Sequence, residues 1–146
     1  MAELRAFTRP ADRTILIQRS IADYDQTGAV EMLSSFNRFL IDVVARYEGN
    51  EQSITECDRK SSDLLHYIEL HDDMNASEGY KTYRKLAVVR RERRISKNEN
   101  ELLLAVYNFI KQNPRMVSEL SSVLGKTRAA KESIEKKIYS ARTDII

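Results

Sequence analysis

Residues 76–112 read ASEGYKTYRKLAVVRRERRISKNENELLLAVYNFIKQ, and this stretch decides the fold. Asn75 and Glu78 have the spacing of a capping box at a helix start, and nothing interrupts the helical pattern before Asn113-Pro114. A continuous helix over this stretch would be about 55 Å long, whereas a compact globule of 146 residues is roughly 38 Å across. The sequence therefore predicts one long helix over about 76–112 in an elongated molecule.

The middle of this long helix is polar on every face apart from Ile95. Residues 90–100 read RRERRISKNEN, and apolar segments flank them on both sides. A helix that is polar all round bridges solvent, pairs its charges with neighbours, or breaks. We therefore expect a single helical domain over 1–146, with sub-clusters at 1–89 and 101–146 joined by a polar helical waist at 90–100.

The segment before the long helix also has helical periodicity. Apolar residues recur every three or four positions over 28–48, and Gly49-Asn50 predicts the end of that helix. Residues 53–70 open with a second capping-box pattern and carry their own apolar face. They are joined to the long helix by the short polar connection 71–75, which predicts a helical hairpin.

A proline marks the predicted start of a helix near each end of the chain. Pro10 predicts the start of a helix that extends to Tyr24, although residues 14–17 could also form a short strand. Pro114 begins a last helical segment, with Gly125 as a candidate division point. Four glycines and two prolines leave few turns for a many-stranded sheet. We expect an all-α fold consisting of an elongated helical hairpin plus a small bundle.

The sequence shows no constellation of catalytic or metal-binding residues. Cys57 lies on an apolar helix face, and the chain's only histidines are His66 and His71. Residues 23–34 open like a calcium loop, but Ser34 stands where the loop needs a bidentate Glu, and a turn that caps the next helix explains the same residues. We expect no enzyme, no catalytic residue, no metal site and no cofactor.

Charge is strongly segregated along the hairpin, with net −7 over residues 42–78 and +7 over residues 79–98. In one interpretation the two helices neutralise each other, in a register that brings Asp63 near Arg84 and Glu56 near Arg91. In the other, the excess of cations forms a phosphate-binding surface. The candidate nucleic-acid-binding residues are Arg90, Arg91, Arg93, Arg94 and Lys97.

Tyr80 and Tyr83 precede this basic run and leave two interpretations open. Aromatic rings beside cations can stack on nucleic-acid bases. Tyrosines at helical spacing are also common as packing residues in a core.

Three segments together resemble small helical proteins encoded by phages and prophages of Gram-positive bacteria. They are DLLHYIEL at 63–70, ASEGYKTY at 76–83 leading into the basic run, and GKTR at 125–128 followed by Ile138, Tyr139 and Arg142. The resemblance covers about residues 54–143. It implies a bacterial host cytoplasm during phage growth, and a role as a replication accessory or an inhibitor of host defences.

We therefore expect a non-enzymatic, phage-type accessory protein that binds nucleic acid or a phosphate-rich ligand through a basic helix. The alternative is a protein–protein interaction module, or an inhibitor of a host defence protein, that acts as a homo-oligomer. No run of about 18 apolar residues and no apolar signal core are present, so the sequence predicts a cytoplasmic protein without membrane contact.

Overall fold

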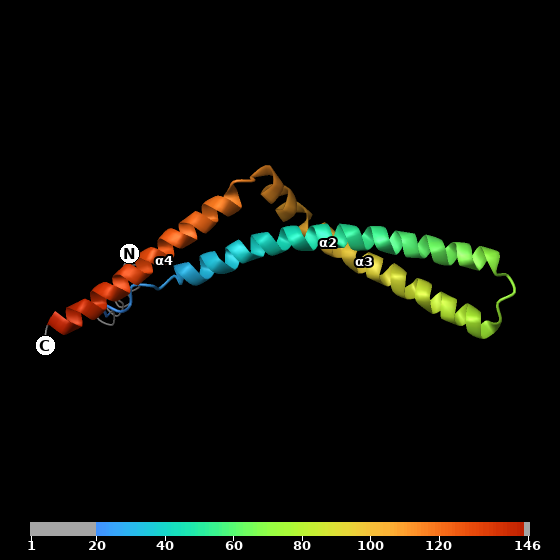
Figure 1. Ribbon diagram of the computed structural model, residues 1–146, viewed down its shortest axis with the longest axis horizontal. Coiled ribbons are helices and arrows are strands. Elements are labelled where there is room, and N and C mark those ends of the chain that lie inside the picture. The colour runs from blue at the N-terminus through green and yellow to red at the C-terminus, as the bar shows by residue number, and fades with distance from the viewer. Residues whose placement is uncertain (1–19, 145–146) are drawn as a thin grey trace, which may run out of the picture. The chain divides into compact units, whose positions relative to one another are not determined.

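The computed structural model describes residues 20–144, with side chains described as far as Ile138 (Figure 1). Three helices follow one another along this part of the chain: α2 (Ala29–Leu70), α3 (Ala76–Gln112) and α4 (Met116–Asp144). Residues 20–144 contain no strand, which confirms the all-α fold. Most of the helix predicted over 10–24 lies outside the described residues, and residues 20–28 are not helical.

Contacts divide the described chain into two compact units. One comprises the residues up to Phe36 together with those from Leu120 onward, and the other is Asn37–Glu119. The polar stretch 90–100 therefore lies inside the second unit instead of separating sub-clusters at 1–89 and 101–146. The reason is that Ser96 and Asn100 within it are buried against α2.

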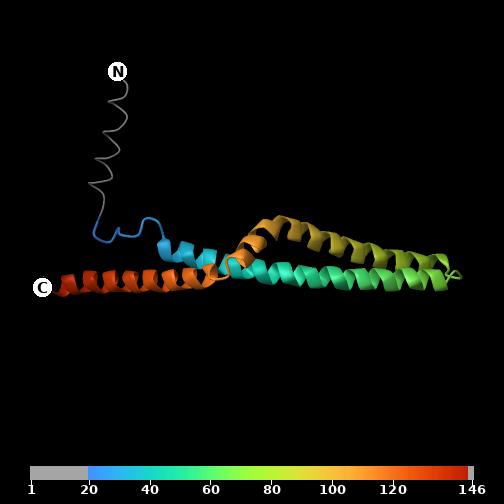
Figure 2. The ribbon, with the colours of Figure 1, turned by 90° about the horizontal axis from the view of Figure 1, so that it is seen from above.

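The second unit is a hairpin in which α2 and α3 lie side by side, as the view from above also shows (Figure 2). The long helix has the predicted bounds because its caps are local. Asn75 is the N-cap residue, and its side-chain oxygen accepts a hydrogen bond of 2.9 Å from the backbone N–H of Glu78. At the other end Asn113 is the C-cap, just before Pro114.

The predicted break at Gly49-Asn50 is wrong, because α2 is one continuous helix of 42 residues. A glycine that ends a helix usually adopts a positive φ, and Gly49 does not. Asn50 is 8% exposed and donates from Nδ2 to Oδ1 of Asn100 at 2.9 Å, so a tertiary contact holds this turn in the helix. In the same way α4 passes through Gly125 without a division.

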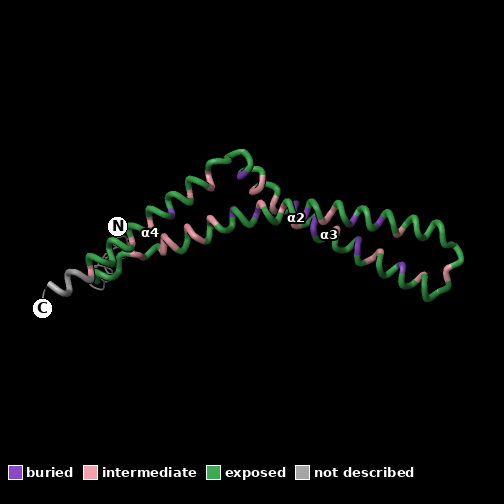
Figure 3. The backbone as a smooth tube through the Cα atoms, in the orientation of Figure 1, coloured by how far each residue is buried: buried purple, intermediate pink, exposed green. Residues whose placement is uncertain are grey.

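The interface of the hairpin follows the heptad spacing of an antiparallel coiled coil. Buried and half-buried residues alternate at three- and four-residue steps along both helices, and these positions are called a and d below. Figure 3 shows them on the facing sides of α2 and α3. In α2 they are Leu40, Val43, Tyr47, Asn50, Ile54, Cys57, Ser61 and Leu64, and in α3 Gly79, Thr82, Leu86, Val89, Arg93, Ser96, Asn100, Leu103, Tyr107 and Ile110.

Polar contacts set the register of this interface. Asn100, 6% exposed, accepts from Asn50 and donates from Nδ2 to the carbonyl of Tyr47 at 3.2 Å and to Oε1 of Glu51 at 3.1 Å. Ser96 faces Ser53, with 3.4 Å between the two hydroxyl oxygens. Residues that face each other across the hairpin, such as Asn50 and Asn100, thus have numbers that add to about 150. The expected pairs, such as Asp63 with Arg84, add to 147.

This shift in register changes the ion pairs. Glu56 pairs with Lys60 on its own helix at 3.1 Å instead of with Arg91. Between the helices, Arg93 pairs with Asp58 and Arg46 pairs with Glu99.

In the first unit, the start of α2 packs against α4. Leu124 is buried there, and Lys131 Nζ lies 3.3 Å from Glu31 and 3.8 Å from Asp25. Oδ1 of Asp25 accepts from the backbone N–H of Ala29 at 3.2 Å, and Gly28 has a φ of 62°. The residues that resemble a calcium loop therefore cap α2.

Replacement of Gly49 by Ala tests the continuity of α2. A Cβ at Gly49 would meet no heavy atom within 4 Å, so the substitution should raise the free energy of unfolding by about 0.5–1 kcal/mol. The matched control is Gly28→Ala, which should lower it because Gly28 has a positive φ. Chemical denaturation followed by circular dichroism measures both, and a destabilising Gly49→Ala would contradict an unbroken helix.

The Asn50–Asn100 contact makes a second prediction. Asn50→Leu or Asn100→Leu alone strands a buried amide and should cost about 1–3 kcal/mol of unfolding free energy. The double variant removes both amides, so its loss should be smaller than the sum of the two single losses. Asn98→Leu, at an exposed position of the same helix, is the control and should change stability by less than about 0.5 kcal/mol.

Candidate functional site

Four of the five predicted basic residues occupy one side of α3, next to the interface with α2. Successive residues of a helix are about 100° apart, so heptad positions e, b and f form a continuous arc. Arg90 and Lys97 are at e, Arg94 is at b and Arg91 is at f, and all four side chains are exposed. Within the described residues none of these four cations has an ion-pair partner. We call them the basic arc.

Arg93, the fifth predicted residue, lies apart from the basic arc. It occupies an a position in the interface, where its side chain is only 19% exposed and its Nε donates to Asp58. The two interpretations of the charge pattern thus apply to different residues. Arg93 is paired within the hairpin, whereas the basic arc faces solvent.

The two tyrosines that precede the basic run lie on the same side of α3. Tyr83 is at e and Tyr80 is at b, so both continue the basic arc toward the start of the helix. Their exposed fractions are 61% for Tyr80 and 64% for Tyr83, which exclude a core-packing role within the described chain. Their rings are therefore available for stacking.

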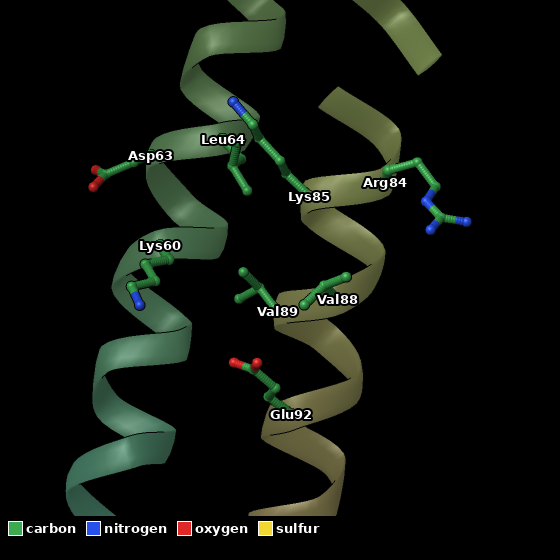
Figure 4. Close-up of a pocket in the computed structure, with 8 residues that line it drawn as sticks. All are labelled: Lys60, Asp63, Leu64, Arg84, Lys85, Val88, Val89 and Glu92. Carbon is green, nitrogen blue, oxygen red and sulfur yellow. The ribbon is translucent and has the colours of Figure 1, made fainter. Parts of the chain in front are cut away.

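Arg84 also extends this surface, and sequence reasoning missed it. It lies seven residues before Arg91 and so shares position f, and Figure 4 shows its guanidinium pointing away from α2. The spacing of seven residues between Arg84 and Arg91 could have indicated that they share a side of the helix. That spacing identifies an outward side only when the side of α3 that faces α2 is known.

A surface groove of about 420 Å³ runs beside the basic arc, between α3 and α2. Arg94 and Lys97 stand on one wall, while Glu51 and Glu101 also line the groove. These carboxylates disfavour a phosphate on the groove floor. An anion is better placed on the outer surface of the basic arc.

Charges near the open end of the hairpin are already paired. Lys111 Nζ lies 3.2 Å from Glu48, and this hydrogen bond raises the pKa of Lys111. The hydrogen bond from Arg46 lowers the pKa of Glu99. The cations of α3 that lack an ion pair in the described chain therefore lie between Lys81 and Lys97.

Other polar candidates have structural roles. Cys57 is 4% exposed at a d position, which makes it a packing residue of the interface. His66 lies 3.3 Å from Glu69, and His71 stacks on Tyr67 with 4.1 Å between ring centroids. Among the described residues no three His, Cys, Asp or Glu side chains are grouped to hold a metal ion.

Two further observations concern membrane spanning and similarity to known proteins. No helix in the described part of the chain has an apolar stretch long enough to cross a bilayer. Comparison with protein-family models, with curated proteins and with solved structures finds no match.

Proposed function

We propose that the protein binds single-stranded nucleic acid along α3, through phosphate contacts to the basic arc and base stacking on Tyr80 and Tyr83. The observation that carries this proposal is the placement of four unpaired cations and two exposed tyrosines on one side of one helix. Cations attract the phosphate backbone and aromatic rings bind unstacked bases, and these are the two recurring elements of single-strand recognition.

The hairpin supports this function by presenting the basic arc on a rigid element. Pairing with α2 holds α3 helical through a stretch whose polar sequence would not keep it so alone. The acidic neighbour also limits the binding site, because the net −7 of residues 42–78 repels phosphates from α2. The single-stranded nucleic acid is therefore expected to lie along α3.

The resemblance to phage-encoded helical proteins supports a biological setting for this activity. We propose a non-enzymatic accessory role on nucleic acid in a bacterial host cytoplasm. The rival function, as an inhibitor of a host protein, would place a protein surface on the basic arc. In a pull-down from host lysate, this rival function predicts that the partner protein is retained after nuclease treatment.

The salt dependence of binding tests the phosphate contacts. If four cations contact phosphates, the logarithm of the affinity for a single strand should fall with log salt at a slope of about −2.8. Arg90→Gln/Arg94→Gln should halve that slope. The control Arg38→Gln/Arg59→Gln removes the same charge from exposed positions of α2 and should leave it unchanged.

Fluorescence anisotropy with a labelled oligonucleotide at several salt concentrations measures these slopes. A labelled polyphosphate distinguishes a general polyanion site from a nucleic-acid site. Absence of binding at low salt, or equal slopes for the two double variants, would contradict the proposal.

The stacking contribution is tested separately by Tyr80→Leu/Tyr83→Leu. Leucine keeps apolar bulk but removes the ring face, so affinity for a single strand should fall by about 1–3 kcal/mol for each stacked base. The salt slope should not change, because no charge is lost. Duplex DNA of the same length is the control, and wild type and variant should bind it alike. If the variant lost the same affinity for duplex DNA as for the single strand, base stacking would not contribute to binding.

A further inference from the structure

Four apolar side chains of α3 are exposed at a spacing of seven residues. The exposed fractions are 45% for Val88, 58% for Ile95, 80% for Leu102 and 51% for Phe109. All four share heptad position c, so they form an apolar stripe that winds slowly along the helix. Position c is about 160° around α3 from position e and about 100° from position b, so the stripe does not overlap Arg90, Arg94 or Lys97. Position f, with Arg84 and Arg91, lies between the stripe and the rest of the basic arc.

Two hollows in the hairpin surface lie beside this stripe, one at Val88 and the other next to Leu102. One, of about 570 Å³, has Leu64, Val88 and Val89 as its apolar wall, and Figure 4 shows Lys85 and Glu92 at its edge. The other, of about 560 Å³, has Phe39, Val43 and Leu103 as its apolar wall. Both are lined by g-position residues of the two helices, so they open on the same side of the hairpin.

We propose that this stripe is the interface with a second copy of the chain, packed antiparallel along α3. The equal spacing makes the stripe complementary to itself. When Ile95 lies opposite Leu102 of the second copy, Val88 lies opposite Phe109 of that copy, and the same pairs form in reverse. Each exposed side chain thus meets an apolar partner in a two-fold symmetric contact.

Charge selects this orientation. Residues 81–94 carry net +6, whereas residues 99–112 carry net −1. A parallel pair would bring the two +6 segments together, and the antiparallel pair brings each against the −1 segment of the other copy. The same alignment places Phe109 of the second copy beside the hollow at Val88, which gives that ring an apolar pocket.

The size of the stripe sets the strength of the contact. From Val88 to Phe109 it is about 32 Å long, and a helix face is about 10 Å wide. Even with the neighbouring side chains of α2, this area is below the ~800 Å² per partner of a standard interface. We therefore expect a weak, concentration-dependent dimer, which leaves Arg90, Arg94 and Lys97 of both copies open and has Arg91 at its edge.

Sedimentation equilibrium of the nuclease-treated full chain over about 1–200 µM tests the proposal. Wild type should show a monomer–dimer equilibrium. Ile95→Lys or Leu102→Glu alone should raise the dimer dissociation constant at least tenfold, because each places a charge opposite an apolar side chain. The control Leu104→Lys changes an apolar residue that is 44% exposed at position e of the same helix and should have no such effect.

The double variant Ile95→Lys/Leu102→Glu decides the orientation. In the antiparallel contact each new lysine faces a glutamate of the other copy, so dimerisation should recover relative to either single variant. In a parallel contact each new lysine would face the lysine of the other copy, so dimerisation should weaken further. Circular dichroism confirms that each variant keeps the helical fold. A strict monomer at 200 µM, unchanged dimerisation in the single variants, or no recovery in the double variant would overturn the proposal.

Discussion

The hydrogen-bonded pair of Asn50 and Asn100 determines how the second unit is built. Both amides are buried, and each can be satisfied only when these two positions of α2 and α3 face one another. Slipping the helices by one heptad would separate the two amides and bring Asn100 opposite Val43 or Cys57, at a cost of a few kcal/mol. A buried asparagine pair therefore selects one register from several that apolar contacts alone would allow.

That register determines which residues of α3 face solvent and on which side of the helix each of them lies. Once Arg93, Ser96 and Asn100 point to α2, the remaining cations of the basic run must lie on the e, b and f side. The apolar residues at c are brought to another side by the same rotation. The hairpin thus places the cationic aromatic surface and the apolar stripe on different sides of α3, with Arg91 at the border between them.

The sequence predicted the long helix well because its limits are local. The Asn75 cap and the Asn113-Pro114 stop act within a few residues, so no tertiary information was needed. The end predicted at Gly49-Asn50 was wrong because that signal is weak and a contact fifty residues away outweighs it. Polar residues also occupy much of the interface, including Ser61 and Thr82, and they hide the heptad pattern from a search for apolar periodicity.

From sequence alone, the all-α class, the hairpin connection at 71–75 and the segregation of charge were determined, because composition, capping and net charge are properties of short segments. Only the tertiary structure decided that α2 is continuous, that Arg93 is paired while its neighbours are free, and that Tyr80 and Tyr83 are exposed. These features depend on which side of each helix meets the other. That choice is made by long-range packing and buried hydrogen bonds, and no local pattern contains it.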